Sequence, residues 1–390
     1  MSDSDYFSRL HSDESFRREE FPVAQKRIFL GHAGVTILPR RVVDAMNRYT
    51  NDCCYDHQEF GDVLQRIQRV RHTCADLIGA TAGEIALLGP TSLGLSLFAN
   101  GLTWNEGDEI LCYKGDYPAN VYPWMEAERR GAKLRFLEPD EPGAITPELV
   151  EAALTPRTKL VALASCHFLT GYRIDTDAIG KLLREREILF SLDAIQTVGA
   201  FETKVEHVDF LSADSHKWML GPASAGIVFV REENFERLRP TLLGAWNVKA
   251  PNFIVQDQVE FHRSAIRYEP GVLNLVGAFG MAAALELLLE VGIERISRHL
   301  LGLKAQLVAG LDDLGYEIIG PRTGPAASSI TTVRCEGRDL EKIFNGLTER
   351  YIIASHRHDR QGREHLRFSP HLYNTEQEIG EVLGALKELS

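Results

Sequence analysis

Short apolar runs alternate with longer amphipathic stretches between about Ile85 and Glu232. The runs are IALLG, EILCY, KLRFLEP, KLVALAS, ILFSLDA, VDFLSAD and GIVFVRE. Consecutive apolar residues predict strands that are buried on both faces, and the helical or loop stretches between most of them predict crossovers. The pattern therefore predicts an α/β domain in which helices cover a mainly parallel sheet.

The pattern changes after Gly271. A long helical stretch over 273–314 is followed by shorter strand-like runs, SSITTVRC and YIIAS, and by a closing helix over 375–389. This succession is typical of a smaller α+β unit. We therefore expect a polar N-terminal arm or neighbour-contacting helix over 1–20, a large α/β domain over 21–272 and a small C-terminal α+β domain over 273–390.

Composition and charge exclude several classes of function. The 390 residues are 44% hydrophobic and 25% charged, which is ordinary for a globular protein with a sizeable core. The net charge is −12, and no run of Lys and Arg forms a basic patch, so we expect no nucleic-acid partner. The most apolar stretch, over 276–293, carries Glu286 and Glu290 and predicts a buried core helix, so we expect no membrane span.

The N-terminus and the cysteines predict a compartment. The first residues, MSDSDYFSRLHSDESFRREE, contain no apolar region of the kind that secretory signals have. The six cysteines include no C-x-x-C pair, so neither a disulfide framework nor a zinc knuckle is expected. We expect reduced thiols in a cytoplasmic protein.

One glycine-containing turn between a predicted strand and a predicted helix offers an anion site. The segment GPTSLGLS, over 89–96, is unlike a nucleotide-binding P-loop because Leu95 occupies the lysine position. Thr91 and Ser92 nevertheless stand where free N–H groups at a helix start attract phosphate, although an ordinary helix N-cap explains them equally well. No G-x-G-x-x-G follows a predicted strand, so a dinucleotide site has no support.

Three polar residues further along the chain suit one cofactor chemistry. Asp193 ends the predicted strand ILFSLDA, Gln196 follows it, and Lys217 lies in SADSHKWMLGP. Ligands of open α/β sheets bind at the carboxyl ends of strands, and a lysine beside an apolar strand suits Schiff-base chemistry. A phosphorylated pyridine aldehyde needs an amine, an anion at its ring nitrogen and a helix N-terminus together, and the spacing is compatible with all three.

From about Phe29 to Leu389 the sequence resembles the class V aminotransferase group of fold-type I pyridoxal phosphate (PLP) enzymes, most specifically in SLDAIQTVGAF…VDFLSADSHKWMLGP. The resemblance implies PLP bound to Lys217 as a Schiff base, with Asp193 at the pyridinium nitrogen and Gln196 at the ring hydroxyl. It places the phosphate at Thr91 and Ser92 on one side and at His216 with Ser212 or Ser215 on the other. It also implies a homodimer with active sites at the interface.

Further matches concern the ring stack and the substrate. In DYPANVYPW, Tyr117 stands where cysteine desulfurases of this group have a histidine stacked on the cofactor. In LRFSPHLYNTEQEI, Arg367 matches the arginine that binds the substrate carboxylate, which implies an amino-acid substrate. The resemblance places His32 and Thr36 in the substrate pocket and His167 near the cofactor ring. Both histidines are candidate acid/base groups, and Tyr117 or either histidine could be the second acid/base that an epimerase needs.

Two departures from the group bear on the reaction. The loop SHRHDRQGREH, over 355–365, contains no cysteine where desulfurases have their nucleophile, and Val272 replaces a threonine that reaches the partner subunit's phosphate. We therefore favour a lyase that performs β-elimination or C–S cleavage, because the relatives that resemble this chain include few established transaminases. The alternatives are an aminotransferase, an amino-acid epimerase and a non-catalytic PLP-binding protein.

Histidines near the end of the chain raise the question of a metal. His356 and His358 alternate in a strand-like run and share a face, and His365 follows them. A histidine-rich loop over the mouth of the active site is the simpler interpretation. We therefore expect no metal site.

Overall fold

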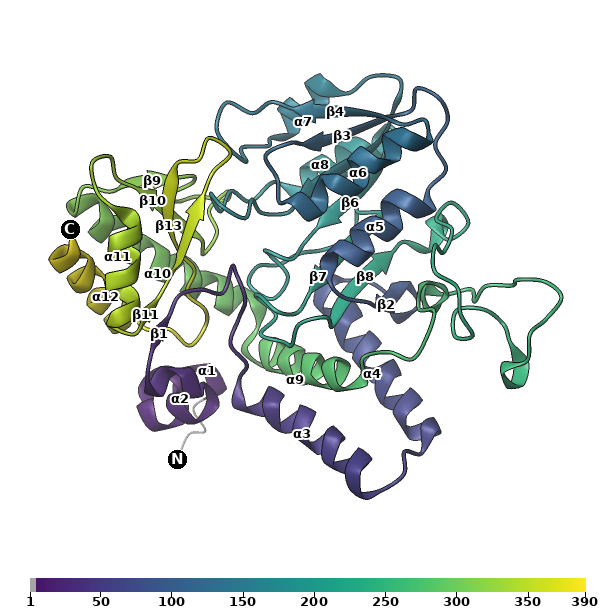
Figure 1. The fold of residues 1–390 in the computed structure, drawn as a ribbon, viewed down its shortest axis with the longest axis horizontal. Helices are drawn as coiled ribbons and strands as arrows, with labels where there is room; N and C mark the ends of the chain where they lie inside the picture. Colours follow the sequence, from purple (N-terminus) through teal and green to yellow (C-terminus); the bar gives the residue numbers. More distant parts are fainter. Residues whose placement is uncertain (1–4) are drawn as a thin grey trace.

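The computed structural model describes residues 5–390. Its centre is a seven-stranded sheet in the order β2-β8-β7-β6-β5-β3-β4 (Figure 1). The strands are β2 (Ile85–Leu87), β3 (Glu109–Tyr113), β4 (Lys133–Leu137), β5 (Thr158–Ala164), β6 (Leu189–Asp193), β7 (Phe210–Asp214) and β8 (Gly226–Val230). β3 to β7 run parallel and β8 pairs antiparallel with both of its neighbours, so the mainly parallel α/β prediction is confirmed.

Alternate side chains of this sheet enter two separate cores. Leu111, Val161 and Leu192 face one core, which also holds α4 (Phe60–Ile78) and α8 (Thr176–Glu185). Ile110, Leu160 and Phe210 face the other, with α5 (Thr91–Gly101) and α6 (Tyr122–Ala127). Burial on both faces explains why the strands read as continuous apolar runs in the sequence.

The small domain holds a four-stranded antiparallel sheet in the order β12-β13-β10-β9. These strands are β9 (Glu317–Ile319), β10 (Thr331–Arg334), β12 (Ser355–His358) and β13 (Glu364–Phe368), and the helices beside them are α10 (Ile293–Asp313), α11 (Leu340–Glu349) and α12 (Glu376–Leu389). From the other end of the chain, β1 (Ile28–Phe29) joins this domain by pairing with β11 (Ile352–Ile353). The sequence did not reveal this N-terminal contribution, because two residues are too few to show a pattern.

The helix that follows the predicted boundary at 272/273 contacts helices that precede it. α9 (Leu275–Val291) packs against α3 (Arg40–Tyr55) and α4. The chain then bends by 80° into α10, and Gly292 occupies the break with φ +87°. Among residues 5–390, no single helix is long and apolar enough to cross a membrane, and only the bent pair α9 and α10 meets that test jointly.

The N-terminal segment packs on its own chain. α1 (Tyr6–Ser12) and α2 (Glu14–Glu20) lie below the small domain in Figure 1. Arg17 of α2 donates to Glu378 of α12 at 2.8 Å and to the carbonyl of Tyr373 at 3.2 Å. The described part of the expected arm is therefore a pair of docked helices.

Candidate active site

A cavity of about 360 Å³ opens between the large domain and the hairpin of β12 and β13. Its walls come from the carboxyl end of β6, the start of α5, the turn after β7, the segment after β3 and the small domain. The residues that line it are Ala33, Gly34, Val35, Pro90, Thr91, Ser92, Tyr117, Ala119, Phe168, Asp193, Ile195, Gln196, His216, Lys217, Arg357 and Arg367. Most of the predicted site residues are thus brought together.

Lys217 supplies a buried amine. It follows β7 in a turn, is 8% exposed, and its Nζ lies 5.4 Å from the centre of the Tyr117 ring. The pKa of this amine is lowered to about 8, because burial and, to a lesser extent, Arg367 lower it more than Asp193 raises it. A substantial neutral fraction near pH 8 makes the amine a nucleophile and a base.

Asp193 supplies a buried carboxylate at the end of β6. Its side chain is 3% exposed and accepts a hydrogen bond from the N–H of Ile195 at 3.1 Å. Burial and then the charge of Asp116 raise the pKa of Asp193 to about 7, and Lys217 opposes the rise. A carboxylate in this position favours a cationic N–H partner in the cavity.

Asp116 is a second buried carboxyl that sequence reasoning missed. It accepts hydrogen bonds from the backbone N–H groups of Tyr117 at 2.7 Å and Ala164 at 3.1 Å, and from the amide of Asn120 at 3.1 Å. Burial raises its pKa to about 6 despite these bonds. Asp116 fixes the segment that carries Tyr117. The one sequence signal for this role of Asp116 is its position directly before Tyr117.

The start of α5 forms the anion-binding end of the cavity. Its N-cap is Pro90, which contributes no side-chain cap, so the first N–H groups of the helix are open to a ligand. Thr91 Oγ1 accepts from the N–H of Asp214 at 2.8 Å, and Ser212 Oγ donates to the Thr91 carbonyl at 3.0 Å. A Cβ at Gly94 would lie 2.4 Å from Ser212 Oγ, so glycine allows this close approach of α5 to β7.

The predicted phosphate residues therefore divide into two groups. Ser92 and His216 line the cavity beside the helix start, and His216 Nδ1 contacts the buried carboxylate of Asp214. Ser212 and Ser215 lie behind the wall, where Ser215 Oγ donates to the carbonyl of Pro222 at 2.7 Å. These two serines support the turn and do not face the cavity.

Gln196 is held rigidly at the cavity wall. Its Nε2 donates to the carbonyl of Ala33 at 3.1 Å, and its Oε1 accepts from Trp218 Nε1 at 2.7 Å. An amide nitrogen has two hydrogens, so one remains available to an acceptor in the cavity. The donor role of Gln196 stays a prediction.

Arg367 on β13 is a buried cation without an anion. It is 1% exposed, and Nη1 donates to the carbonyl of Phe168. Its Nε and Nη2 are buried and make no hydrogen bond in the described chain. Burial and then Arg357 lower its pKa to about 9. Unpaired buried donors cost free energy, and these two donors of the guanidinium can bind a carboxylate.

Arg357 on β12 is a second cavity residue that the sequence did not reveal. The hairpin pairs Ser355 with Arg367 and Arg357 with His365. Residues paired across a ladder, and those two places away, share one face of the sheet, so Arg357 and Arg367 lie on the same face. Strand alternation could have placed Arg357 there only if the pairing of β12 with β13 had been known.

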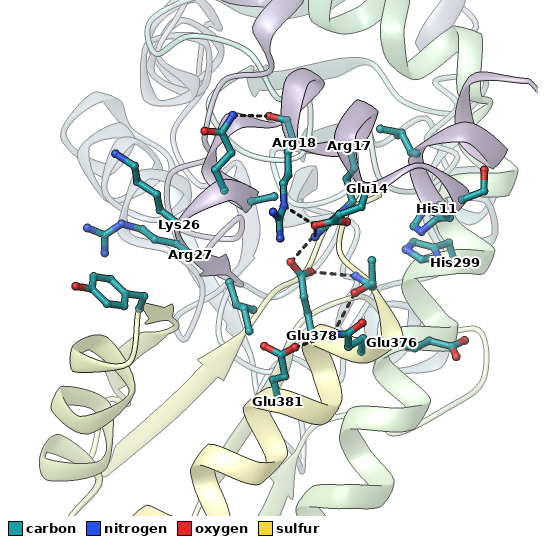
Figure 2. Close-up of a pocket in the computed structure, with 18 of the residues that line it drawn as sticks. His11, Glu14, Arg17, Arg18, Lys26, Arg27, His299, Glu376, Glu378 and Glu381 are labelled. Atoms are coloured by element: carbon teal, nitrogen blue, oxygen red, sulfur yellow. Dashed lines mark hydrogen bonds and ion pairs between the residues drawn. The ribbon is translucent and has the colours of Figure 1, made fainter.

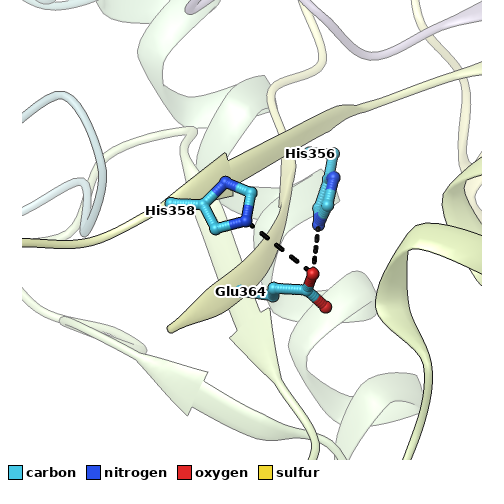
Figure 3. A group of neighbouring side chains, drawn as sticks. All are labelled: His356, His358 and Glu364. Carbon is cyan, nitrogen blue, oxygen red and sulfur yellow. Dashed lines mark ion pairs between the residues drawn. The ribbon is translucent and has the colours of Figure 1, made fainter. Parts of the chain in front are cut away.

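The opposite face of the hairpin carries the histidines. His356 Nε2 and His358 Nε2 lie 3.8 and 3.7 Å from Glu364 Oε1 (Figure 3). The three potential ligand atoms all lie within 4.8 Å of one another, with Glu364 in place of His365 as the third member. The absence of a metal here stays a prediction.

Tyr117 and Phe168 form an aromatic rim. Tyr117 is 47% exposed, and its ring meets that of Phe168 edge-on at 5.5 Å between centroids. The Tyr117 ring therefore covers the space above the Lys217 amine. This position suits stacking on a flat ligand.

Besides Ser212 and Ser215, three predicted residues do not line the cavity: His32, Thr36 and His167. His32 is fully buried, with Nδ1 2.7 Å from Thr36 Oγ1 and Nε2 3.2 Å from the Tyr373 hydroxyl. His167 Nε2 contacts the carbonyl of Gly115 at 3.1 Å, and burial lowers the pKa of His167 to about 4. The rings are thus engaged in packing, and neither is available to the cavity as an acid or base.

A larger cavity, of about 880 Å³, lies between the N-terminal helices and the small domain (Figure 2). Charged side chains line it, but its buried arginine is paired: Arg17 contacts Glu14 at 2.7 Å and Glu378 at 2.8 Å. Paired charges hold the docked helices in place. The smaller cavity, with its unpaired amine and guanidinium, is the better candidate for chemistry.

No cysteine lines the cavity at Lys217 in the described chain. Cys53 and Cys54 are exposed on α3, and Cys74, Cys112 and Cys166 are buried. Burial raises the pKa of the Cys166 thiol to about 11 and that of Cys74 to about 12. The thiols of Cys74 and Cys166 are therefore poor nucleophiles at neutral pH.

Comparison with known proteins identifies the family. The family model for aminotransferase class-V matches residues 28–382. A probable cysteine desulfurase of Pyrococcus abyssi (strain GE5 / Orsay) is 28% identical, with 95% of this chain and 96% of the relative covered. The uncharacterized aminotransferase YcbU of Bacillus subtilis (strain 168) is 24% identical, with 95% and 96% covered.

Comparison with solved structures agrees with the family match. An apo cysteine desulfurase from Thermococcus onnurineus NA1 superposes with a TM-score of 0.89 at 27% identity and covers 95% of this chain and 96% of its own. The cystine C-S lyase C-DES superposes with a TM-score of 0.84 at 20% identity, covers 95% of this chain and 100% of its own, and supports the fold alone. The resemblance stated from the sequence is confirmed: the chain belongs to the aminotransferase class-V family of PLP-dependent enzymes and has their fold-type I architecture.

Proposed function

We propose that this chain is a PLP-dependent lyase that releases a β-substituent from an amino acid with a free α-carboxylate. One observation carries the proposal. The cavity holds the Lys217 amine together with the unpaired buried donors of Arg367, and among residues 5–390 no thiol lines it. An amine and a carboxylate receptor in one cavity suit an amino acid, and the missing thiol disfavours persulfide transfer.

The residues present fit PLP. Lys217 would bind its aldehyde carbon, Asp193 would hold the proton of its ring nitrogen, and Gln196 would donate to its ring hydroxyl. The open N–H groups at the start of α5, with Ser92 and His216, would hold the phosphate. The Tyr117 ring would cover the exposed face. When bound, PLP supplies a covalent link to the substrate amine and an electron sink for the α-carbon.

The chain's own groups then account for the proton steps. Arg367 orients the substrate by binding the substrate's carboxylate. The Lys217 amine, in its neutral form, takes the α-proton. Loss of the β-substituent and hydrolysis with one water yield ammonia, a 2-keto acid and the protonated leaving group. An epimerase would need a second acid or base on the opposite face. His32 and His167 are held in packing contacts instead, so Tyr117 is the one of the three candidates that lines the cavity.

We infer that the protein is a homodimer. Between Val248 and Phe261, which form an isolated bridge, the chain projects from the large domain (Figure 1). The tip exposes Phe253 (67%), Ile254 (62%) and Val255 (93%). Apolar side chains gathered on one projection are typical of an interface. Light scattering should give the mass of a dimer. The double variant Phe253→Ser, Val255→Ser should have a lower mass, and the control variant Tyr351→Ser should keep the mass of the dimer.

We also infer a cytoplasmic location. The six cysteines are free, including Cys53 and Cys54, which are adjacent and exposed. Adjacent exposed thiols persist where the compartment is reducing. Fractionation of the source cells should place the protein with cytoplasmic markers.

The experiment is a substrate panel. Purified protein is saturated with PLP, mixed with single amino acids, and followed by its visible spectrum while ammonia, keto acid and sulfide are assayed. A lyase releases ammonia and keto acid together from a β-substituted amino acid. Lys217→Ala serves as the control that removes the amine but retains the rest of the cavity. Absence of products from every amino acid, despite a spectral sign of PLP binding, would contradict the proposal.

A further inference from the structure

The cavity is lined by three cationic side chains, Arg357, Arg367 and Lys217, and by one carboxylate, Asp193, so the α-carboxylate of one amino acid still leaves one cation without a partner. Arg357 and Arg367 both approach Gly34: a Cβ built on Gly34 would lie 3.4 Å from Arg357 Nη2 and 3.6 Å from Arg367 Nη2. The two guanidinium groups thus converge on one point of the cavity wall. Lys217 lies in the same cavity and adds a third cationic group.

Arg357 has no counterion in the described chain, in contrast to its neighbours. Arg363, on the same hairpin, contacts Asp359 at 2.6 Å. Arg334, on the adjacent β10, contacts Glu317 through two nitrogens at 2.5 and 2.7 Å. Among residues 5–390, no group forms a hydrogen bond or ion pair with the Arg357 side chain, which is exposed to solvent.

The proximity of these cations has an electrostatic effect. Burial lowers the pKa of both Arg367 and Lys217, and Arg357 lowers each of them further. Like charges that converge without an intervening anion destabilise each other. An arrangement of this kind becomes favourable when a bound ligand supplies two anionic groups.

We propose that Arg357 forms a second anion subsite, so that the preferred substrate is an amino acid whose β-substituent ends in an acidic group. Arg367, deeper and 1% exposed, takes the α-carboxylate, and Arg357, at the mouth, takes the acid of the side chain. This assignment rests on the proposed lyase function and adds the class of substrate to it. The acid leaves with the β-substituent, so Arg357 also selects which leaving groups are accepted.

A matched pair of ligands tests the subsite. S-carboxymethyl-L-cysteine and S-carbamoylmethyl-L-cysteine have nearly the same shape, and only the first has an acidic side chain. Their dissociation constants are measured by calorimetry with PLP-saturated Lys217→Ala protein, in which turnover is blocked, and their kcat/KM values with the protein that retains Lys217. A bidentate guanidinium contact should favour the acid by roughly 10- to 100-fold.

The variant Arg357→Gln removes the second guanidinium. In that background the preference for the acid should fall to within about threefold. Arg363→Gln is the control, because it removes an exposed arginine of the same hairpin that already has a carboxylate partner. It should leave the preference intact.

The outcomes separate this inference from the function on which it rests. Equal binding of the acid and the amide, or a preference that survives Arg357→Gln, would overturn the subsite alone. Failure of both ligands to bind or react would count against the lyase proposal itself. If Arg357→Gln instead converted a dimer to a monomer without altering the preference, Arg357 would be an interface residue and the subsite would be refuted.

Discussion

The Lys217 amine lies beneath the Tyr117 ring, with Nζ 5.4 Å from the ring centroid. The two residues come from different connections of the sheet, and the buried Asp116 carboxylate fixes the segment that carries the ring. A flat ligand bound covalently to the amine would therefore lie against the aromatic face.

Replacement of Lys217 by Ala should abolish covalent attachment of PLP. Borohydride treatment followed by peptide mass spectrometry should find the reduced adduct on Lys217 in the natural protein and none in the variant. Turnover should fall at least roughly 100-fold, because the residue is also the base for the α-proton. An adduct of equal yield on another lysine would refute the assignment.

Replacement of Arg367 by Gln should raise KM for the amino acid by roughly 10- to 100-fold, because a bidentate contact with the carboxylate is lost. PLP affinity should change little, since the proposed PLP contacts come from Lys217, Asp193, Gln196 and the start of α5, and Arg367 lies on β13. Thermal unfolding and a PLP titration accompany the kinetics, because the residue is buried. An unchanged KM in a folded variant would exclude the carboxylate role.

Tyr117 should act through its ring and not through its hydroxyl. Tyr117→Phe retains the stacking surface, so its affinity for PLP should match that of the natural protein. Tyr117→Ala removes the ring and should weaken PLP binding by about 0.5–1.5 kcal/mol. Titration of the three proteins with PLP measures the difference. A loss in Tyr117→Phe as large as that in Tyr117→Ala would show that the hydroxyl matters.

The reactivity of Lys217 without cofactor should depend on pH in a defined way. Burial lowers the pKa of its amine to about 8, and Asp193 acts in the opposite direction. Acetylation of Lys217 should therefore rise through a midpoint near pH 8. In Asp193→Asn the opposing carboxylate is lost, so the pKa falls and the midpoint moves to lower pH. Peptide mass spectrometry across a pH series measures both, and a midpoint that moved upward would contradict the electrostatic account.

Much of the fold follows from the sequence. Each of the seven apolar runs forms a strand of the large sheet, because burial on both faces leaves a continuous apolar signature. The position of α9 could not be predicted. In the sequence, the apolar stretch of α9 runs on into α10. The packing of α9 against α3 and α4 becomes visible only in the structure. The pairing of β1 with β11 joins residues too far apart to be recognised by pattern.

The site was predictable where chemistry follows local context. Lys217, Asp193 and Gln196 lie beside predicted strand ends, and the structure brings them into one cavity. Arg357 was missed because its face depends on the pairing of β12 with β13. His32 and His167 looked available in the sequence, but their partners, Tyr373 and Gly115, come from distant segments. The catalytic roles themselves stay predictions.

The stoichiometry of products tests the central claim most directly. PLP-saturated protein is given S-carboxymethyl-L-cysteine without any keto-acid acceptor, and ammonia and keto acid are counted over many turnovers. The lyase account predicts continuous release of both in equal amounts. A reaction that stops after one turnover until a keto acid is added would identify an aminotransferase, and accumulation of the D-enantiomer without ammonia would identify an epimerase. Either result would contradict the account.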